Sequence, residues 1–420
     1  MSQPGPAQAP APGEGAEEKG FLRSPLFPIF LIVLVDVFGF TLVLPLLPFY
    51  AEHLGASPIT VGLLTASFAA CQLIAGPILG RISDKVGRRP TLLVSQIGTL
   101  IGFVILGFAN SLWLLFLSRI IDGLTAGNLS IAQAYISDVT KPENRTKAFG
   151  LIGIAFGAGF LIGPAISGFL SQYGYHWPAF AAMTLSAGSI ICTWFLLREA
   201  PRGAEEGERA SAVRGGRFSQ FGSFFSRPLP RRRLLEFFAF TLSFSTLIGG
   251  LALFLERQFS FGAKQVGFVF AFSGLIGGIV QGGALGRLVK KLGEEKLATV
   301  GFISMGVGYF FLGWIFGIPL LLVAVTVAGF GTAVTRPALT TLITKSVGRS
   351  EQGAALGTSQ SLASVAQILG PIIAGWLIEH HLLKSYGLVA ASIALAGAMF
   401  ALSRGTREGE VEEGMDTARA

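Results

Sequence analysis

Three ionisable residues interrupt stretches of sequence that are otherwise apolar, and their types suit the movement of protons. Asp36 lies inside an apolar run that begins near residue 25. At about 1.5 Å per residue this is roughly 17 Å along a helix, near the middle of a hydrocarbon core about 30 Å thick. Arg119 and Asp122, three residues apart in a later apolar run, share one helical face and can pair. A desolvated carboxyl group changes its proton occupancy when a guanidinium approaches or leaves. We therefore interpret Asp36, Arg119 and Asp122 as a candidate proton-coupling site.

A purely structural interpretation of these residues stays open. In it, Arg119 and Asp122 only satisfy each other, and Asp36 caps a local helix break near Gly39. Ionisable residues inside a membrane span are rare and usually mark a pathway for ions or substrates, which favours the functional interpretation.

The composition indicates what carries these residues. Of the 420 residues, 51% are hydrophobic and 13% are charged, against about 25% charged in soluble domains. An ordinary soluble enzyme is therefore excluded, and blocks of about 20 apolar residues are long enough to span a bilayer. Twelve such segments occur, at approximately 25–49, 60–80, 91–110, 112–137, 147–171, 178–198, 234–256, 265–286, 297–316, 319–344, 353–378 and 385–403.

We predict an all-α membrane protein with twelve transmembrane helices in two pseudo-symmetric six-helix halves. The halves are 25–198 and 234–403, joined by a flexible cytoplasmic linker at 199–233, with a disordered cytoplasmic tail at 1–24 and a second tail at 404–420. An internal repeat supports this division. Gly80-Arg81 recurs as Gly286-Arg287, and Gly163-Pro164 recurs as Gly370-Pro371 at nearly the same spacing.

The basic residues predict the orientation, because Lys and Arg are retained on the cytoplasmic side. With the N-terminus inside, all but five of the 32 Lys and Arg fall in inner loops, the linker and the tails. Arg119 and Arg336 lie within spans, and Arg336 is near enough to the inner end of its span to snorkel. Both termini are therefore expected in the cytoplasm, and the net charge of +8 needs no nucleic-acid partner.

The inner loop at 80–90 combines glycines with clustered charges. It reads Gly-Arg-Ile-Ser-Asp-Lys-Val-Gly-Arg-Arg-Pro, in which Gly80 and Gly87 allow a tight turn and Asp84 can make ion pairs that a helix movement would break. This stretch resembles the signature loop of the major facilitator superfamily, Gly-x-Leu-Ala-Asp-Arg-x-Gly-Arg-Lys. The superfamily fold has the twelve helices and two halves predicted above.

Two further motifs carry the resemblance. Residues 119–127, Arg-Ile-Ile-Asp-Gly-Leu-Thr-Ala-Gly, resemble the fourth-span motif, with Asp122 where Gln is often found. The segment that contains Gly159, Gly163, Pro164 and Gly168 resembles the fifth-span motif associated with antiporters. Together with Asp36, these motifs resemble the drug/proton antiporter branch that includes tetracycline exporters. Spans 3 and 9 contain no interior carboxylate, where tetracycline exporters carry one.

The resemblance implies an inner gate. Asp84 should face the N-terminal end of span 11, where the helix dipole favours an anion, and Arg88 should approach Asp138 at the inner end of span 4. The gate would lock the outward-facing state, and it would be asymmetric because the copy of the motif in the C-terminal half is degraded, with Glu294 and Glu295 after Gly293. Its residues are Gly80, Asp84, Gly87, Arg88, Arg89 and Asp138.

A substrate cavity is expected where the halves meet. Amide and aromatic side chains in the spans suit amphipathic organic molecules better than sugars or inorganic ions, although such amides also serve as hydrogen-bonding contacts between helices. The candidates are Phe40, Asn128, Gln133, Phe240, Phe244, Gln281, Gln360 and Gln367.

The leading hypothesis is a proton-coupled transporter of the cell (inner) membrane that exports amphipathic or hydrophobic small molecules by alternating access. The alternative is a proton-linked or facilitative carrier for one metabolite or lipid. The sequence lacks the nucleotide loop of an ATP-driven pump and the motifs of an intramembrane enzyme, so we expect no enzyme activity. We also expect a monomer in contact with membrane lipids, with no metal and no cofactor, the proton gradient being the energy source.

Overall fold

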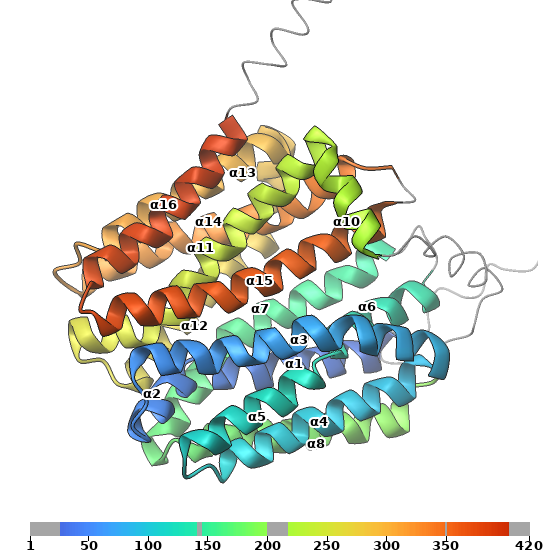
Figure 1. Cartoon of the computed structure of the whole chain (residues 1–420), viewed down its shortest axis with the longest axis horizontal. Helices are drawn as coiled ribbons and strands as arrows, with labels where there is room; N and C mark the ends of the chain where they lie inside the picture. The colour runs from blue at the N-terminus through green and yellow to red at the C-terminus, as the bar shows by residue number, and fades with distance from the viewer. Residues whose placement is uncertain (1–25, 141–144, 200–216, 349–350, 403–420) are drawn as a thin grey trace, which may run out of the picture.

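The computed structural model describes residues 26–140, 145–199, 217–348 and 351–402, so the two predicted tails and part of the predicted linker lie outside the described residues. Within these ranges the chain forms helices and no strand (Figure 1). The helices are α1 Leu26–Val43, α2 Leu46–His53, α3 Pro58–Val86, α4 Arg88–Gly107, α5 Leu112–Leu124, α6 Asn128–Val139, α7 Arg145–Leu170, α8 His176–Leu196, α10 Arg217–Ser226, α11 Pro228–Phe259, α12 Ala263–Ile279, α13 Leu285–Leu312, α14 Ile318–Lys345, α15 Gln352–Glu379 and α16 Leu383–Leu402. Two short elements, η3 Ser171–Tyr173 and the π-helix η4 Val280–Ala284, complete them.

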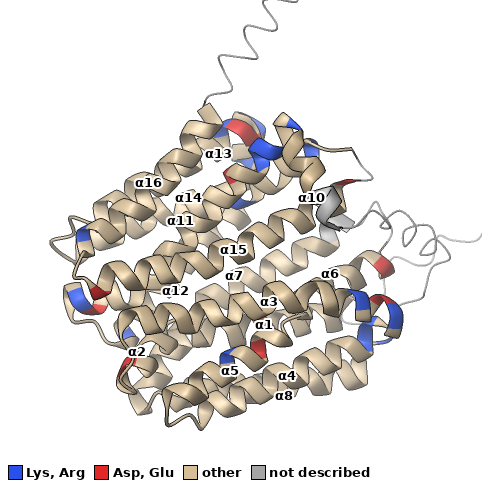
Figure 2. Ribbon diagram, in the orientation of Figure 1, with Lys and Arg blue, Asp and Glu red and all other residues tan. Residues whose placement is uncertain are grey.

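Among the described residues, eleven helical runs are long and apolar enough to cross a membrane. One of them, Ala263–Leu312, has 50 residues, far more than the roughly 20 that one crossing needs. It bends at Gly293, whose φ of 73° and ψ of 162° are not helical. If this run is counted as two crossings, the described chain contains the twelve that the sequence predicts. Charged side chains gather near the helix ends and leave the middle of the bundle largely apolar (Figure 2).

The two halves meet along two pairs of helices. Helix α3 of the N-terminal half packs against α15 of the C-terminal half, and α7 packs against α12. Figure 1 shows α15 lying along α3. The contacts are backbone to backbone near one end of each pair. A Cβ added at Gly62 would lie 2.4 Å from the carbonyl oxygen of Pro371, and one added at Gly267 would lie 2.5 Å from that of Pro164. The halves are therefore closed at the end that the charge pattern assigns to the outside.

At the other end the same helices stand apart. Towards the inner ends of these four helices lie glycines at which an added Cβ would have no neighbour within 4 Å, among them Gly80, Gly157, Gly278 and Gly357. Gly80 and Gly278 follow the close-contact residues of their helices, Gly157 and Gly357 precede theirs, and the helical spacing puts each glycine on the same face as its close-contact residue. We call the space between these inner faces the central cleft. The structure is closed outside and open inside.

The linker prediction is wrong for part of its length. Residues 217–226 form α10, and α11 begins at Pro228, before the predicted start at residue 234. Phe224 of α10 is buried in the core, and Arg227 pairs with Glu351 at the start of α15 at 3.0 and 3.1 Å. Burial of an aromatic side chain and a two-point ion pair stabilise a helix that composition alone assigned to a flexible segment.

Candidate functional site

Asp36 lies in the interior of α1, next to the fourth span. Its Oδ2 atom is buried and has no hydrogen-bond partner among the described residues. The Asn128 side chain lies beside the carboxyl group, and the Asp122 carboxyl is near enough to act on it electrostatically. A buried carboxyl oxygen without a hydrogen-bond partner is costly when the group is ionised.

Asn128 is brought to Asp36 by a break in the fourth span. The span consists of α5 and α6, which are separated at residues 125–127. Ser95 of α4 holds the break, because its hydroxyl donates to the carbonyl of Thr125 and accepts from the backbone N–H of Gly127. Broken helices are common at transporter sites, since the positive end of the second half-helix favours negative charge. A carboxylate such as that of Asp36 is therefore better tolerated beside the start of α6 than elsewhere in the interior.

Arg119 and Asp122 form the predicted pair within α5. Arg119 Nη1 lies 3.2 Å from Asp122 Oδ2, and both side chains are nearly inaccessible. The spacing of three residues accounts for this contact. No ion pair joins Arg119 to Asp36 within the ranges described. In this inward-open structure Arg119 therefore pairs with Asp122, and the polar side chain beside Asp36 is that of Asn128.

The fifth-span motif lies between α1 and the other half. On one side, Cβ atoms added at Gly159 and Gly163 would lie 2.4 Å from Val37 and 2.1 Å from Thr41 of α1. On the other side, one added at Gly168 would lie 2.9 Å from the carbonyl oxygen of Lys264 in α12. Only glycine allows these approaches. The motif thus joins the helix that carries Asp36 to the interface between the halves.

The predicted cavity residues divide by exposure. Phe40 is 43% exposed, and Gln133, Gln281 and Gln360 are exposed as well. Phe244 and Gln367 are partly buried, whereas Phe240 and Asn128 are only 4% and 7% exposed. Gln281 lies in the π-helix η4, a distortion frequent at functional sites. In this state Phe240 belongs to the packed core, stacked on Phe244.

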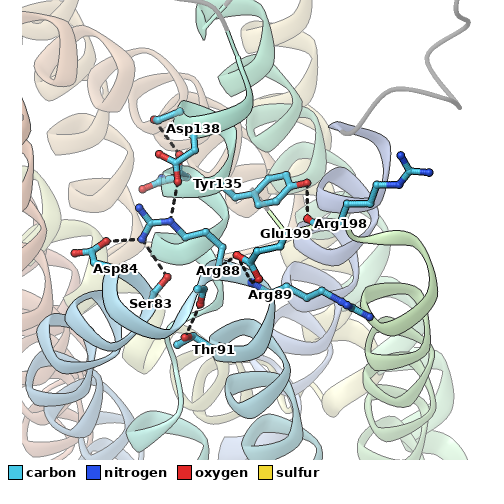
Figure 3. A network of polar contacts seen from close by, with 12 residues as sticks. Ser83, Asp84, Arg88, Arg89, Thr91, Tyr135, Asp138, Arg198 and Glu199 are labelled. Carbon is cyan, nitrogen blue, oxygen red and sulfur yellow. Dashed lines mark hydrogen bonds and ion pairs between the residues drawn. The ribbon is translucent and has the colours of Figure 1, made fainter. Parts of the chain in front are cut away.

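The inner cluster centres on Arg88, at the start of α4 (Figure 3). Its Nε donates to Asp138 Oδ2 at 2.8 Å, which confirms the contact that the resemblance implied. Its Nη1 donates to Asp84 Oδ1 at 2.5 Å and to Ser83 Oγ at 3.1 Å. The Asp84 side chain is 64% exposed. Contact with the start of span 11 therefore stays a prediction for the outward-facing state.

Glu199 is a member of this cluster that sequence reasoning missed. Its carboxylate accepts from the backbone N–H groups of Arg88 and Arg89 at 2.6 and 3.2 Å, as Figure 3 shows. It thereby caps the N-terminus of α4 from the end of the sixth span. Arg89 reaches back to the carbonyl of Trp194 at 2.5 Å. The only signal in the sequence is an acidic residue directly after span 6, within the segment predicted as the linker.

Arg336 also lies in a different environment from the one predicted from the sequence. Instead of snorkelling to the inner surface, its guanidinium lies over the ring of Phe156, 6.0 Å from the centroid. Phe156 belongs to α7 of the other half, so this contact crosses the central cleft.

The outer end is tied by groups that the sequence did not single out. Arg257 of α11 pairs with Glu52 of α2 at 2.6 Å and with Glu256 at 2.7 Å. Glu379 of α15 accepts from Ser57 Oγ at 2.8 Å and from the backbone N–H of Ile59 at 2.9 Å. Burial and the neighbouring Glu256 carboxyl raise the pKa of Glu52 to about 7. The ion pair of Glu52 with Arg257 and the hydrogen bonds of Glu379 to the start of α3 each join the N-terminal half to the C-terminal half.

Comparison with known proteins agrees with this architecture. The sequence matches the Major Facilitator Superfamily over residues 29–319 and 237–417. It is 32% identical over 361 residues to the tetracycline resistance protein, class B, of Escherichia coli, covering 84% of this chain and 88% of that protein. It is 27% identical over 356 residues to multidrug resistance protein 2 of Bacillus subtilis (strain 168), covering 84% and 89%. The human organic anion transporter MFSD10 (TETRAN) has a similar fold, with a TM-score of 0.68 and 23% identity over 90% of this chain and 98% of that chain.

The fold and the site thus define an all-α, multi-pass integral membrane protein of the transporter class. The chain belongs to the Major Facilitator Superfamily. Within that superfamily it resembles the tetracycline resistance and multidrug resistance proteins.

Proposed function

We propose that this protein is a proton-coupled antiporter that exports amphipathic or hydrophobic small molecules by alternating access. The observation that carries the proposal is the Asp36 carboxyl in the interior of α1, with one buried oxygen unpartnered in the described chain. The similarity to tetracycline and multidrug resistance proteins supports efflux rather than uptake of one metabolite or lipid.

The coupling step follows from the position of Asp36. In the inward-open state the substrate enters the central cleft from the cytoplasm, and Asp36 releases its proton to the cytoplasm. When the cleft closes inside and opens outside, Asp36 binds a proton again and the substrate leaves. The motif of α7 transmits the change, because Gly163 touches α1 and Gly168 touches α12. The inward-open conformation therefore binds substrate and releases the proton, and the outward-open conformation releases substrate and binds the proton.

The surroundings of the transporter are part of the proposal. The basic inner loops favour the cell (inner) membrane with both termini in the cytoplasm. The inner cluster around Arg88 serves as the gate, and the outer contacts of Glu52 and Glu379 release when the outer end opens. The protein acts as a monomer surrounded by lipid and uses the proton gradient, without a metal or another cofactor.

Tetracycline is the first substrate to test, and ethidium is the second because it represents flat multidrug cations. The full chain is reconstituted in proteoliposomes, a pH gradient is imposed, and movement of each drug is followed. We expect drug movement against its gradient, abolished by a protonophore and by Asp36→Asn, with Asp36→Glu partly active. Full gradient-driven transport of both drugs by Asp36→Asn would remove the proton role of Asp36. Absence of gradient-driven transport of either drug by the parent would contradict the export proposal.

A further inference from the structure

Arg336 is a cation that borders the central cleft and has no acidic partner among the described residues. Its side chain is exposed, although it belongs to the interior of the membrane-spanning helix α14. In the described part of the chain, its guanidinium makes no ion pair and no side-chain hydrogen bond; its contact is the ring of Phe156 at 6.0 Å. The other interior arginine, Arg119, is paired with Asp122. Arg336 is thus the guanidinium that the fold leaves available in the cleft.

Its depth matches that of the proton site. Counted from the inner helix ends, Arg336 lies nine residues from Lys345, and Phe156 lies eleven residues from Arg145. Asp36 lies ten residues from Leu26. At about 1.5 Å per residue, all three are roughly 14 to 17 Å from the inner ends. An object in contact with Arg336 therefore occupies the same layer of the membrane as Asp36.

Aromatic rings extend from the guanidinium along the wall that the N-terminal half contributes to the cleft. Phe156 stacks on Phe160 with centroids 6.4 Å apart, and Phe160 meets Phe40 of α1 edge-on at the same distance. Phe40 is exposed and lies one helical turn from Asp36. The wall thus has a cation at one end, flat apolar surface along its length and the proton site close to the other end.

We propose that Arg336 and this aromatic wall form a recognition site for amphipathic organic anions with a flat apolar body. The inference rests on the proposed function and names the substrate class for the same cleft. The planar guanidinium pairs with a carboxylate, sulfonate or enolate through two parallel hydrogen bonds. The Phe156 ring holds the cation in place while the site is empty. A substrate anion supplies the counter-charge that the described chain does not, and its ring system lies against Phe156 and Phe160.

The test compares two probes that differ in one group. Binding of 1-pyrenebutyrate and of its neutral amide, 1-pyrenebutyramide, is measured on the purified full-length protein, so that the ring system is constant and only the charge changes. For Arg336→Gln we expect the dissociation constant of the carboxylate to rise about tenfold or more, while that of the amide stays within about twofold. Arg336→Lys should recover part of the carboxylate affinity, because the charge is kept and the planar fork is lost.

Two further variants separate recognition from general effects. Lys290→Gln removes an exposed positive charge from the inner end of α13, so it reports non-specific attraction of anions and should leave both affinities unchanged. Phe156→Leu should weaken both probes, since both use the ring. Arg336→Gln and Arg336→Lys are also compared with the parent in thermal unfolding, to exclude loss of fold.

The outcomes distinguish this inference from the proposed function. Equal weakening of both probes by Arg336→Gln, or no weakening of either, would overturn the anion site. Failure of the parent to prefer the carboxylate, while it transports tetracycline in the proton gradient, would overturn the anion site and leave the proposed function standing. Carboxylate binding that depends on Arg336, in a parent that transports no drug in a gradient, would support the anion site and contradict the proposed function.

Discussion

The Thr41 hydroxyl of α1 donates a hydrogen bond to the carbonyl oxygen of Gly159 in α7 at 3.0 Å. The bond joins the helix of the proton site to the motif helix one and a half turns beyond Asp36. It is possible because Gly159 and Gly163 have no side chains, so the two backbones approach closely. The antiporter motif therefore has a physical role in this chain: it holds α1 against α7 while α7 touches the other half.

A methyl group at position 163 tests this packing. In Gly163→Ala the new Cβ would lie 2.1 Å from Thr41 Oγ1, so α1 and α7 must move apart. We expect a loss of about 1–3 kcal/mol in the free energy of unfolding, together with loss of coupled transport. Thermal or denaturant unfolding in detergent measures the first effect. Gly150→Ala, in the same helix with no atom within 4 Å, is the matched control and should retain full stability; an equal loss in both variants would contradict the packing account.

The inner cluster predicts a shift between conformations. Asp84 is largely exposed in this inward-open structure, so Asp84→Asn should cost little here and more in a state where Asp84 meets the start of α15. The inward-open population should therefore rise, by about threefold to tenfold for one charge contact. Distances between spin labels at Val86 and Lys290, at the inner ends of α3 and α13, report this. An unchanged distance distribution with unimpaired transport would exclude Asp84 from the gate.

The outer contact predicts a dependence on pH. Burial and Glu256 raise the pKa of Glu52 to about 7, from an ordinary value of 4.5, whereas separation of the halves would return Glu52 to water. The closed outer end therefore binds the proton more tightly than the open one. Closure is favoured at low pH and loses this contribution as pH rises through about 7.

Labels at Ala56, in the loop before α3, and at Lys384, at the outer end of α16, can measure this effect. Between pH 8 and pH 6 we expect the ratio of outer-closed to outer-open protein to rise by up to about tenfold. Glu52→Gln should remove the dependence in this window. A parent that opens outside as pH falls, or a Glu52→Gln variant that keeps the full dependence, would show that another group is responsible.

Local spacing was enough to predict some of these features. The apolar blocks predicted the spans, and a separation of three residues predicted the pair of Arg119 with Asp122. The contact of Arg88 with Asp138 came from the resemblance to a family loop. These features depend on helix periodicity or on a motif within one half.

Contacts between distant segments escaped prediction. The break at 125–127 contains no proline and is held by Ser95 of another helix. The cap of α4 comes from Glu199, more than one hundred residues away. Arg336 meets Phe156 only because the two halves face each other across the cleft. In each case the contact depends on how distant helices pack against each other, and a single sequence does not reveal that packing.

The release of protons when a substrate binds tests the central claim most directly. Tetracycline is added to purified protein in weakly buffered solution near neutral pH, and the pH change is recorded for the parent and for Asp36→Asn. If Asp36 exchanges its proton for substrate, the parent releases protons in a saturable way, and the variant binds the drug without releasing any. Equal release by the parent and by Asp36→Asn would contradict the assignment of Asp36 as the coupling residue.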